Sequence, residues 1–259
     1  MDKREKLKEL SQKVAISNEI IQKARYELGK TEQKVLLYMV SKIKPLDFGD
    51  EVYTFNAKNC CEVCNFNTDG GWYSQTVKEI MVNLKTKPII IPLGGRRKLI
   101  TSWFNDAVID EETGEFKITF SKILMPYLYE LKKNYTSFAL EYVVAMKSEY
   151  GIRLYEYLKS VVYQGIVNTI SLEEFREKVG CEGKYTQSSD LRARVIEPAL
   201  KDINDFSDLK VSYKFIKTGK KVSHIEFMML TPRDLDLVVR TAKRADELDI
   251  DLFRKNQPI

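Results

Sequence analysis

Two turns of the sequence concentrate positive charge beside glycine. One spans residues 94–98 and the other spans residues 217–221, and each holds three cations. The six cations are Arg96, Arg97, Lys98, Lys217, Lys220 and Lys221. Cationic side chains on an exposed turn bind phosphate groups and add affinity without reading a base sequence. In the absence of a polyanionic partner they would be ordinary solvated residues, so the turns need support from other features.

Further polar side chains lie on two amphipathic segments, where they could reach base edges in a DNA groove. In residues 72–84 and again from residue 188 to about residue 203, the apolar positions fall on one face of a helix. The candidates for DNA contact on these segments are Ser74, Gln75, Lys78, Gln187, Ser188, Arg192, Arg194 and Lys201. Arg192 lies nearer the apolar face and would act by bending outward from the first turn. For each residue the alternative is again a solvated surface side chain.

The residue types that catalysis needs are scarce. His224 is the single histidine, and no nucleophile or carboxylate accompanies it in sequence, so a catalytic triad is not expected. Cys61 and Cys64 have the spacing of half a zinc site, but no second pair follows, which favours buried free thiols. A metal or redox role for Cys60, Cys61 and Cys64 stays open. We expect a protein that is not an enzyme and holds no cofactor.

The composition fits a folded protein with a polyanionic partner. The chain has 259 residues, is 44% hydrophobic and carries a net charge of +5. Residues 85–98 hold five basic residues and no acidic one, and residues 184–221 hold nine basic and five acidic residues. The first residues are too charged for a secretory signal, and no apolar run is long enough to span a bilayer. We expect a soluble, cytoplasmic protein with no membrane partner.

Helical periodicity and capping residues predict the elements that carry these side chains. Helices are predicted over residues 18–26, 31–43, 57–64, 72–84, 142–163, 172–179 and from residue 188 onward. Thr31 is the predicted cap of the second helix, and Ser171 with Glu174 forms a capping box for the sixth. Ser188 is a predicted cap of the last helix, and Pro198 predicts a kink because it removes one helical hydrogen bond.

Alternating apolar residues predict the strands. They cover residues 53–55, 89–91, 99–109, 116–120, 209–215 and 225–229. Each basic turn therefore joins two strands into a β-hairpin, and in both halves the hairpin follows a polar-faced helix. This repeated order predicts an α+β fold with two tandem, pseudo-duplicated winged-helix domains. The predicted limits are an N-terminal arm at 1–16, a first domain at 17–130, a second domain at 131–231 and a C-terminal helical tail at 232–259.

Several segments resemble a known family. They are residues 18–28, 31–34, 150–158, 194–204 and 208–211, and the likeness extends over about residues 14–230. Residues 194–204 are the most specific, because proline is rare inside an amphipathic helix. The segments resemble the replication initiator (Rep) proteins of theta-replicating plasmids with iteron repeats, which are built from two winged-helix domains. Asp202 departs from the family pattern, in which we expect glutamate.

The resemblance implies a sequence-specific DNA-binding protein that initiates plasmid replication. Such initiators bind direct origin repeats as monomers, help to melt AT-rich DNA and recruit the host replication initiator, helicase and primase. As homodimers, paired mainly through the first domain, they bind an inverted repeat and repress their own gene. The resemblance thus implies double-stranded DNA as ligand, a monomer–dimer equilibrium that limits copy number, and a bacterial cytoplasm as the site of action.

Two other functions fit the same residues. One is a transcriptional regulator with tandem winged helices and no role in replication. The other is a scaffold whose winged helices contact proteins and whose basic turns are incidental.

Overall fold

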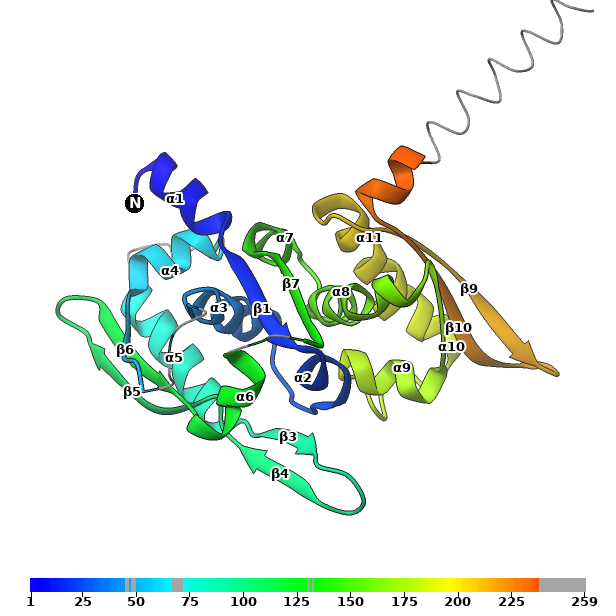
Figure 1. Ribbon diagram of the computed structural model, residues 1–259, viewed down its shortest axis with the longest axis horizontal. Coiled ribbons are helices and arrows are strands. Elements are labelled where there is room, and N and C mark those ends of the chain that lie inside the picture. Colours follow the sequence, from blue (N-terminus) through cyan, green and yellow to red (C-terminus); the bar gives the residue numbers. More distant parts are fainter. Residues whose placement is uncertain (45–46, 48–49, 67–71, 130, 132, 238–259) are drawn as a thin grey trace, which may run out of the picture.

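Helix α3 (Lys30–Val40) is the centre of the N-terminal half, and its residues 32–40 are all buried. The computed structural model describes residues 1–44, 47, 50–66, 72–129, 131 and 133–237 (Figure 1). The helix begins after Gly29, whose N–H donates to the Glu32 carboxylate over 2.8 Å. The prediction of Thr31 as the cap was wrong, because Glu32 reaches back to an N–H that precedes Thr31.

Four more described helices lie before the first hairpin: α1 (Lys3–Leu10), α2 (Asn18–Lys23), α4 (Ala57–Val63) and α5 (Tyr73–Thr86). Asn56 accepts a hydrogen bond from the N–H of Asn59 and caps α4, so this helix begins where a capping side chain is available. Helix α2 ends earlier than predicted. The chain becomes extended at Ala24, and Arg25 then pairs with Ile90 in an isolated β-bridge.

In the described part of the N-terminal half, the predicted long return strand 99–109 is divided between two hairpins that belong to separate sheets. Strands β3 (Ile89–Pro92) and β4 (Lys98–Thr101) pair with each other, whereas β5 (Phe104–Asp110) joins a sheet of order β2-β6-β5. The remaining members of that sheet are β2 (Tyr53–Asn56) and β6 (Glu115–Phe120). The predicted strand 99–109 is therefore broken at residues 102–103. The Trp103 side chain turns into the core there, 1% exposed, and packs edge-on against Tyr26.

The middle of the chain pairs with a strand near the N-terminus. After the short 3₁₀ turn η2 (Lys122–Leu124) and helix α6 (Met125–Leu128), strand β7 (Tyr135–Ala139) pairs antiparallel with β1 (Lys13–Ser17). The end of the predicted arm thus lies in a two-stranded sheet that runs through the middle of the molecule (Figure 1).

The C-terminal half begins with α7 (Leu140–Ala145) and α8 (Glu149–Val161), which the sequence predicted as one helix. They are separate because the Asp202 carboxylate accepts hydrogen bonds from the N–H groups of Lys147 and Ser148, at 2.7 and 2.6 Å. These bonds hold extended backbone between the helices and satisfy donors at the start of α8. Then follow η3 (Val162–Gln164), β8 (Val167–Ser171) and α9 (Leu172–Val179).

Helix α9 has the predicted ends. Ser171 accepts a hydrogen bond from the N–H of Glu174, and Gly180 closes the helix in the left-handed conformation. The chain continues through α10 (Ser188–Leu191), η4 (Arg192–Ile196) and α11 (Glu197–Phe206) into β9 (Lys210–Thr218) and β10 (Lys221–Leu230). The sheet order is β8-β10-β9. Residues 232–237 are helical, and the rest of the predicted tail lies outside the described residues. No described helix is both long and apolar enough to cross a lipid bilayer.

Buried contacts fix the two halves against each other. The Arg153 guanidinium lies over the Tyr26 ring at 3.9 Å, and Lys178 donates to the carbonyl of Gln22 at 2.6 Å. Lys34 of α3 donates to the carbonyl of Val144 in α7, and burial lowers its pKa. One apolar cluster runs through both halves. The described helices and hairpins are therefore held in a defined relative orientation.

Candidate nucleic-acid interface

The polar-faced segment of the second half, α10–η4–α11, contains a π-helical turn immediately before Pro198. The N–H of Glu197 donates to the carbonyl of Arg192, five residues back, across η4. Pro198 has no N–H, and in a regular helix its ring would meet the carbonyl four residues earlier, that of Arg194. The wider turn makes room for the ring. The kink predicted at Pro198 is thus a local widening that places Arg194 on a π turn.

Two side chains of α11 attach this segment to its surroundings. Asp202 holds the start of α8, and Gly151 lies so close that an added Cβ would be 3.3 Å from the Asp202 carboxylate. Asn204 donates to the carbonyl of Val211 at 2.9 Å and accepts from its N–H at 2.7 Å. This pair of bonds ties the helix to strand β9. The same helix therefore sets the position of the hairpin that follows it.

The predicted contact residues on this segment differ in their surroundings. Arg194 is exposed and has no side-chain partner among the described residues. Arg192 donates to the Glu197 carboxylate at 2.6 Å, and Lys201 donates to Asp205 at 2.7 Å, which lowers the pKa of Asp205. Gln187 is exposed and Ser188 is half-buried. Ser188 does not cap the helix: the cap position is Gln187, which makes no side-chain cap bond. Two of the three cations thus have internal partners.

The second basic turn forms the tip of the β9–β10 hairpin. Lys217, Lys220 and Lys221 are exposed and unpaired among the described side chains, whereas Lys214 lower on the hairpin pairs with Glu226 at 2.7 Å. Gly219 turns the chain at a φ of +63°, a conformation that favours glycine. The tip therefore presents positive charge that no described carboxylate neutralises.

Helix α5 is the counterpart in the first half, and its apolar side faces the core as predicted. Val77, Ile80, Met81 and Leu84 are buried. On the other side Ser74 is half-buried, and Gln75 is exposed and donates to Glu79 at 2.8 Å. Lys78 is exposed but pairs with Glu111 at 2.6 Å. Every predicted polar residue of α5 is thus accessible, but its one predicted cation already has a partner.

The first basic turn forms the tip of the β3–β4 hairpin. Arg96, Arg97 and Lys98 are exposed, and their side chains have no partner in the part of the chain that the structure describes. The Leu93 N–H donates to the carbonyl of Arg97 at 3.0 Å and closes the turn. The hairpin starts directly after α5, so the charged tip is tethered to that helix by β3.

The turn between the predicted strands 99–109 and 116–120 is the tip of a second hairpin, β5–β6, which lies beside α5. Its acidic turn, residues 110–115, joins β5 to β6 and contains Asp110, Glu111, Glu112 and Glu115. Glu111 reaches Lys78, and a Cβ added at Gly114 would lie 3.6 Å from the Ser74 hydroxyl. The sequence shows this turn as a cluster of carboxylates. Its position next to α5, however, depends on the interruption of the predicted strand 99–109 at Trp103. The acidic turn makes the start of α5 less positive than the sequence suggested.

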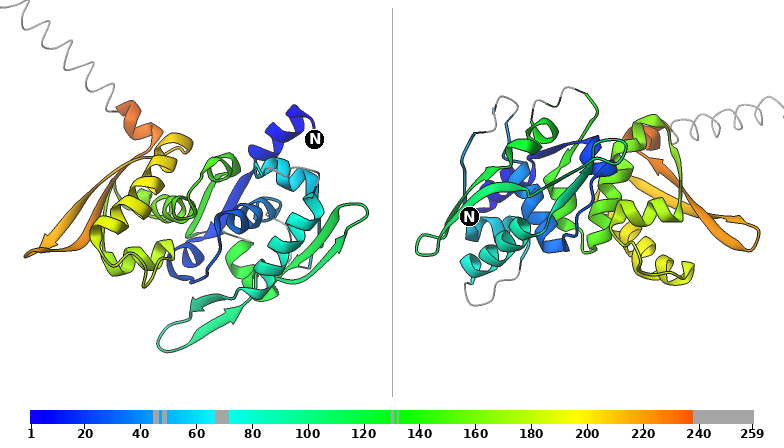
Figure 2. Two further views of the ribbon diagram at one scale, coloured as in Figure 1. Left: turned by 180° about the vertical axis from the view of Figure 1, so that it is seen from behind. Right: turned by 90° about the horizontal axis from the view of Figure 1, so that it is seen from below.

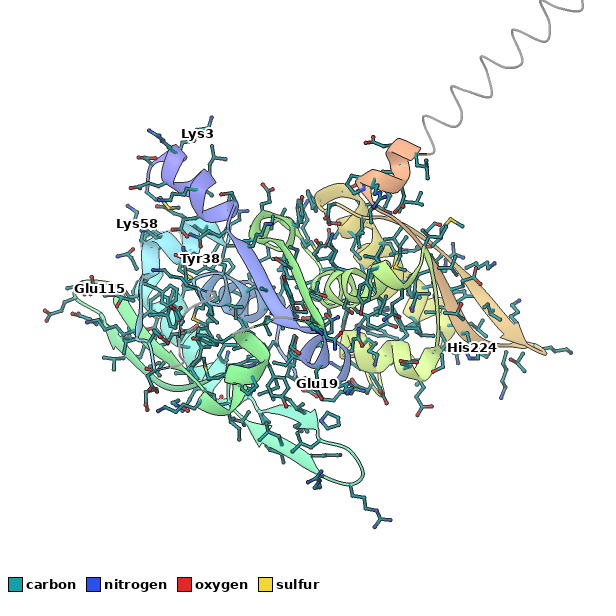
Figure 3. The ribbon with its side chains drawn as sticks, in the orientation of Figure 1. Lys3, Glu19, Tyr38, Lys58, Glu115 and His224 are labelled. Atoms are coloured by element: carbon teal, nitrogen blue, oxygen red, sulfur yellow. The ribbon has the colours of Figure 1, made fainter. Side chains whose placement is uncertain are left out.

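The two predicted reading helices share one side of the molecule, and the two hairpins extend away from the body. Seen from below, α5 and the α10–α11 segment lie along the same side (Figure 2, right). The β3–β4 and β9–β10 hairpins project outward from the body (Figure 1). Figure 3 places Glu115 and His224 at opposite ends of the molecule, so the acidic turn lies far from the second hairpin. Seven of the ten predicted contact cations have no side-chain partner among the described residues, and they lie on the tips of the two hairpins and on the π turn.

The residues that could bind a metal do not converge in the described structure. Cys60, Cys61, Cys64 and Cys181 are buried free thiols, as predicted. Burial raises the pKa of Cys61 to about 12, which keeps it protonated near neutral pH. No group of three or more potential ligands occurs among the described residues. His224 is exposed on β10.

Known proteins share both the sequence pattern and the fold. Residues 13–159 match the family model described as "Initiator Replication protein, WH1", and residues 171–229 match "Initiator Rep protein, WH2". A "Replication initiation protein" of Escherichia coli is 27% identical over 225 residues, which cover 83% of this chain and 69% of that protein. An "Uncharacterized 27.6 kDa protein" of Escherichia coli is 24% identical over 220 residues, which cover 80% of this chain and 91% of that protein.

A solved structure has the same architecture. It is described as "Crystal structure of Pi initiator protein in complex with iteron DNA", with a TM-score of 0.68 and 17% sequence identity. The match covers 87% of this chain and 99% of that chain. The α+β fold with two winged-helix domains predicted from the sequence is thereby confirmed. Because the two family models span most of its length, the chain belongs to the initiator replication protein family, with WH1 followed by WH2.

Proposed function

We propose that this protein binds repeated sites in double-stranded DNA at a plasmid origin and initiates replication there. The observation that carries the proposal is the position of the seven predicted contact cations that have no side-chain partner among the described residues. Arg194 lies on the π turn, and the other six form the tips of the β3–β4 and β9–β10 hairpins. A duplex laid along the side shared by α5 and α10–α11 would meet both reading helices, with each tip against a phosphate strand.

The proposed roles follow from which cations are free. The six tip residues bind phosphate and supply affinity, whereas Arg194 reads a base edge, because an arginine fork pairs well with guanine in the major groove. Gln187 and Ser188 contribute from the start of α10, and Ser74 and Gln75 from α5. Lys78, Arg192 and Lys201 act as auxiliary contacts, since each must first leave a carboxylate partner. The chain acts by binding, with no catalytic residue.

The proposed partners are those that the family resemblance implied. The monomer binds direct repeats and recruits the host initiator, helicase and primase. A homodimer, paired mainly through the first domain (17–130), binds an inverted repeat and represses the gene, while the second domain (131–231) provides the main recognition. The solved relative carries iteron DNA according to its description, which supports a repeated site as ligand. These events take place in the bacterial cytoplasm, on the plasmid.

Binding at several salt concentrations tests the DNA contact. If the six tip cations each neutralise one phosphate, log affinity should fall against log salt with a slope of about −5, at about 0.9 per phosphate. The probe is the DNA upstream of the protein's own gene, and a footprint there should show repeated protection. A flat salt response would refute the DNA interface and favour the protein-binding scaffold.

A replication assay separates the initiator from the alternative transcriptional regulator. A plasmid that carries only this gene and its upstream repeats should replicate in a suitable host. Specific DNA binding combined with persistent failure to replicate in several hosts would favour the regulator. The basic surface fits either function, but the match to both initiator family models favours replication.

A further inference from the structure

The exposed face of α5 carries one large apolar side chain, Val82, and Trp72 lies on the same face at the residue that precedes the helix. Trp72, Gln75, Glu79, Val82 and Thr86 recur at intervals of three or four residues and so share one face, opposite the buried side chains. Trp72 is 68% exposed and Val82 is 53% exposed. Neither side chain contributes to the core, so both are accessible to a ligand that approaches this face of the helix.

The cations of α5 and its C-terminal end have internal partners. Lys78 pairs with Glu111, Lys85 donates to the carbonyls of Phe104 and Asn105, and Lys87 pairs with Glu32. Positive charge for this part of the surface comes instead from the tip of the β3–β4 hairpin, which follows the helix directly. Helix α5 itself therefore offers apolar and neutral polar groups, next to a separate element that can hold phosphate.

We propose that α5 reads the C5-methyl groups of thymine in the major groove, chiefly through Val82. Trp72 makes a second apolar contact with the DNA at the start of the helix. This inference rests on the proposed function and adds the chemical feature that the first domain recognises. In the major groove the thymine methyl is the apolar mark that distinguishes an A·T pair, and apolar side chains contact it. The neighbouring basic tip supplies the backbone contact that holds the helix in register.

Replacement of thymine by deoxyuridine tests the proposal directly, because it removes the methyl group and leaves base pairing unchanged. The probe is a duplex that the full-length protein selects from a random-sequence pool, resynthesised with one thymine at a time replaced. Burial of one methyl group predicts that replacement at one or two positions weakens wild-type binding about three- to fourfold. The Val82→Ala variant should bind the thymine and deoxyuridine probes equally well at one of those positions.

A matched variant controls for the loss of a valine side chain. Val108→Ala makes the same change at a residue that is 65% exposed on β5, and this variant should keep the full response to deoxyuridine. Neither substitution should unfold the protein, since both side chains are exposed. In α5 alanine also has the higher helix propensity.

Tryptophan emission gives an independent readout. Trp72 is exposed, whereas Trp103 is buried at 1% exposure, so DNA contact at the start of α5 should change the emission of Trp72 alone. The change should disappear in Trp72→Phe. It should persist in Val82→Ala at saturating DNA.

Three results would overturn the inference. One is wild-type binding that is indifferent to deoxyuridine at every position. Another is a full deoxyuridine response retained by both Val82→Ala and Trp72→Ala, which would place methyl recognition elsewhere. In both cases salt-dependent binding would leave the proposed function standing. Absence of any salt-dependent DNA binding would instead remove the proposed function, and this inference with it.

Discussion

The lysines at the tip of the β9–β10 hairpin provide the most direct test of how this protein holds DNA. We consider the combined substitution of Lys217, Lys220 and Lys221 by alanine. All three are exposed and have no side-chain partner among the described residues. Each would release condensed counterions on binding without first breaking an internal ion pair. Removal of three phosphate contacts should therefore make the salt slope shallower by about 2.7, from about −5 to between −2 and −3.

The assay is the binding of the full-length protein to its own upstream DNA, measured from about 50 to about 200 mM salt, the range over which phosphate contacts dominate. A control with the same loss of net charge replaces Lys3, Arg4 and Lys8 on α1 by alanine. Figure 3 shows Lys3 on the opposite side of the molecule from the hairpin that carries His224. Screening over about 10 Å makes such remote exposed charges ineffective, so the control should retain the wild-type slope.

The reasoning would be refuted in two ways. An unchanged slope in the tip variant would show that the hairpin does not reach phosphate. An equal loss in the α1 control would show that the protein responds to net charge and not to local contacts. Both variants should melt at the wild-type temperature, because the substituted side chains are exposed and make no buried contact.

Three further substitutions test other parts of the structure. Arg194→Ala should lose about 1–3 kcal/mol of discrimination between the selected site and a mutated site, as measured by competition binding; a uniform loss for all sequences would make Arg194 a phosphate contact. Asn204→Leu removes both hydrogen bonds to Val211 and should lower the free energy of unfolding by about 1–3 kcal/mol in urea titrations, because it leaves buried backbone groups unpaired; an unchanged unfolding midpoint would show that Asn204 does not clamp β9. Burial raises the pKa of Glu156 from its usual 4.5 to about 7, so between those values the folded protein holds a proton that the unfolded chain has lost. Stability should therefore fall by about 3 kcal/mol as the pH rises from about 4 to about 8, and Glu156→Gln should remove that fall; a Gln variant with the same pH dependence would contradict this assignment.

The elements whose causes are local could be predicted from the amino-acid sequence. Apolar periodicity identified the core face of α5, Asn56 and Ser171 began their helices, and Gly180 ended α9. The basic turns were predicted correctly as hairpin tips, because glycine between alternating strands is a local signal. These patterns, together with the resemblance of several segments to plasmid initiators, were sufficient to predict the two winged-helix domains.

Tertiary contacts decided what local patterns could not. The predicted strand 99–109 is two strands because burial of the Trp103 side chain turns the chain between sheets, and the predicted helix 142–163 is two helices because Asp202 binds the N–H groups between them. The sequence also could not show which cations remain unpaired, because the partner of Lys78 is Glu111, 33 residues away. Periodicity reports the side of an element that faces the core, whereas the partner of a surface charge depends on how distant segments pack.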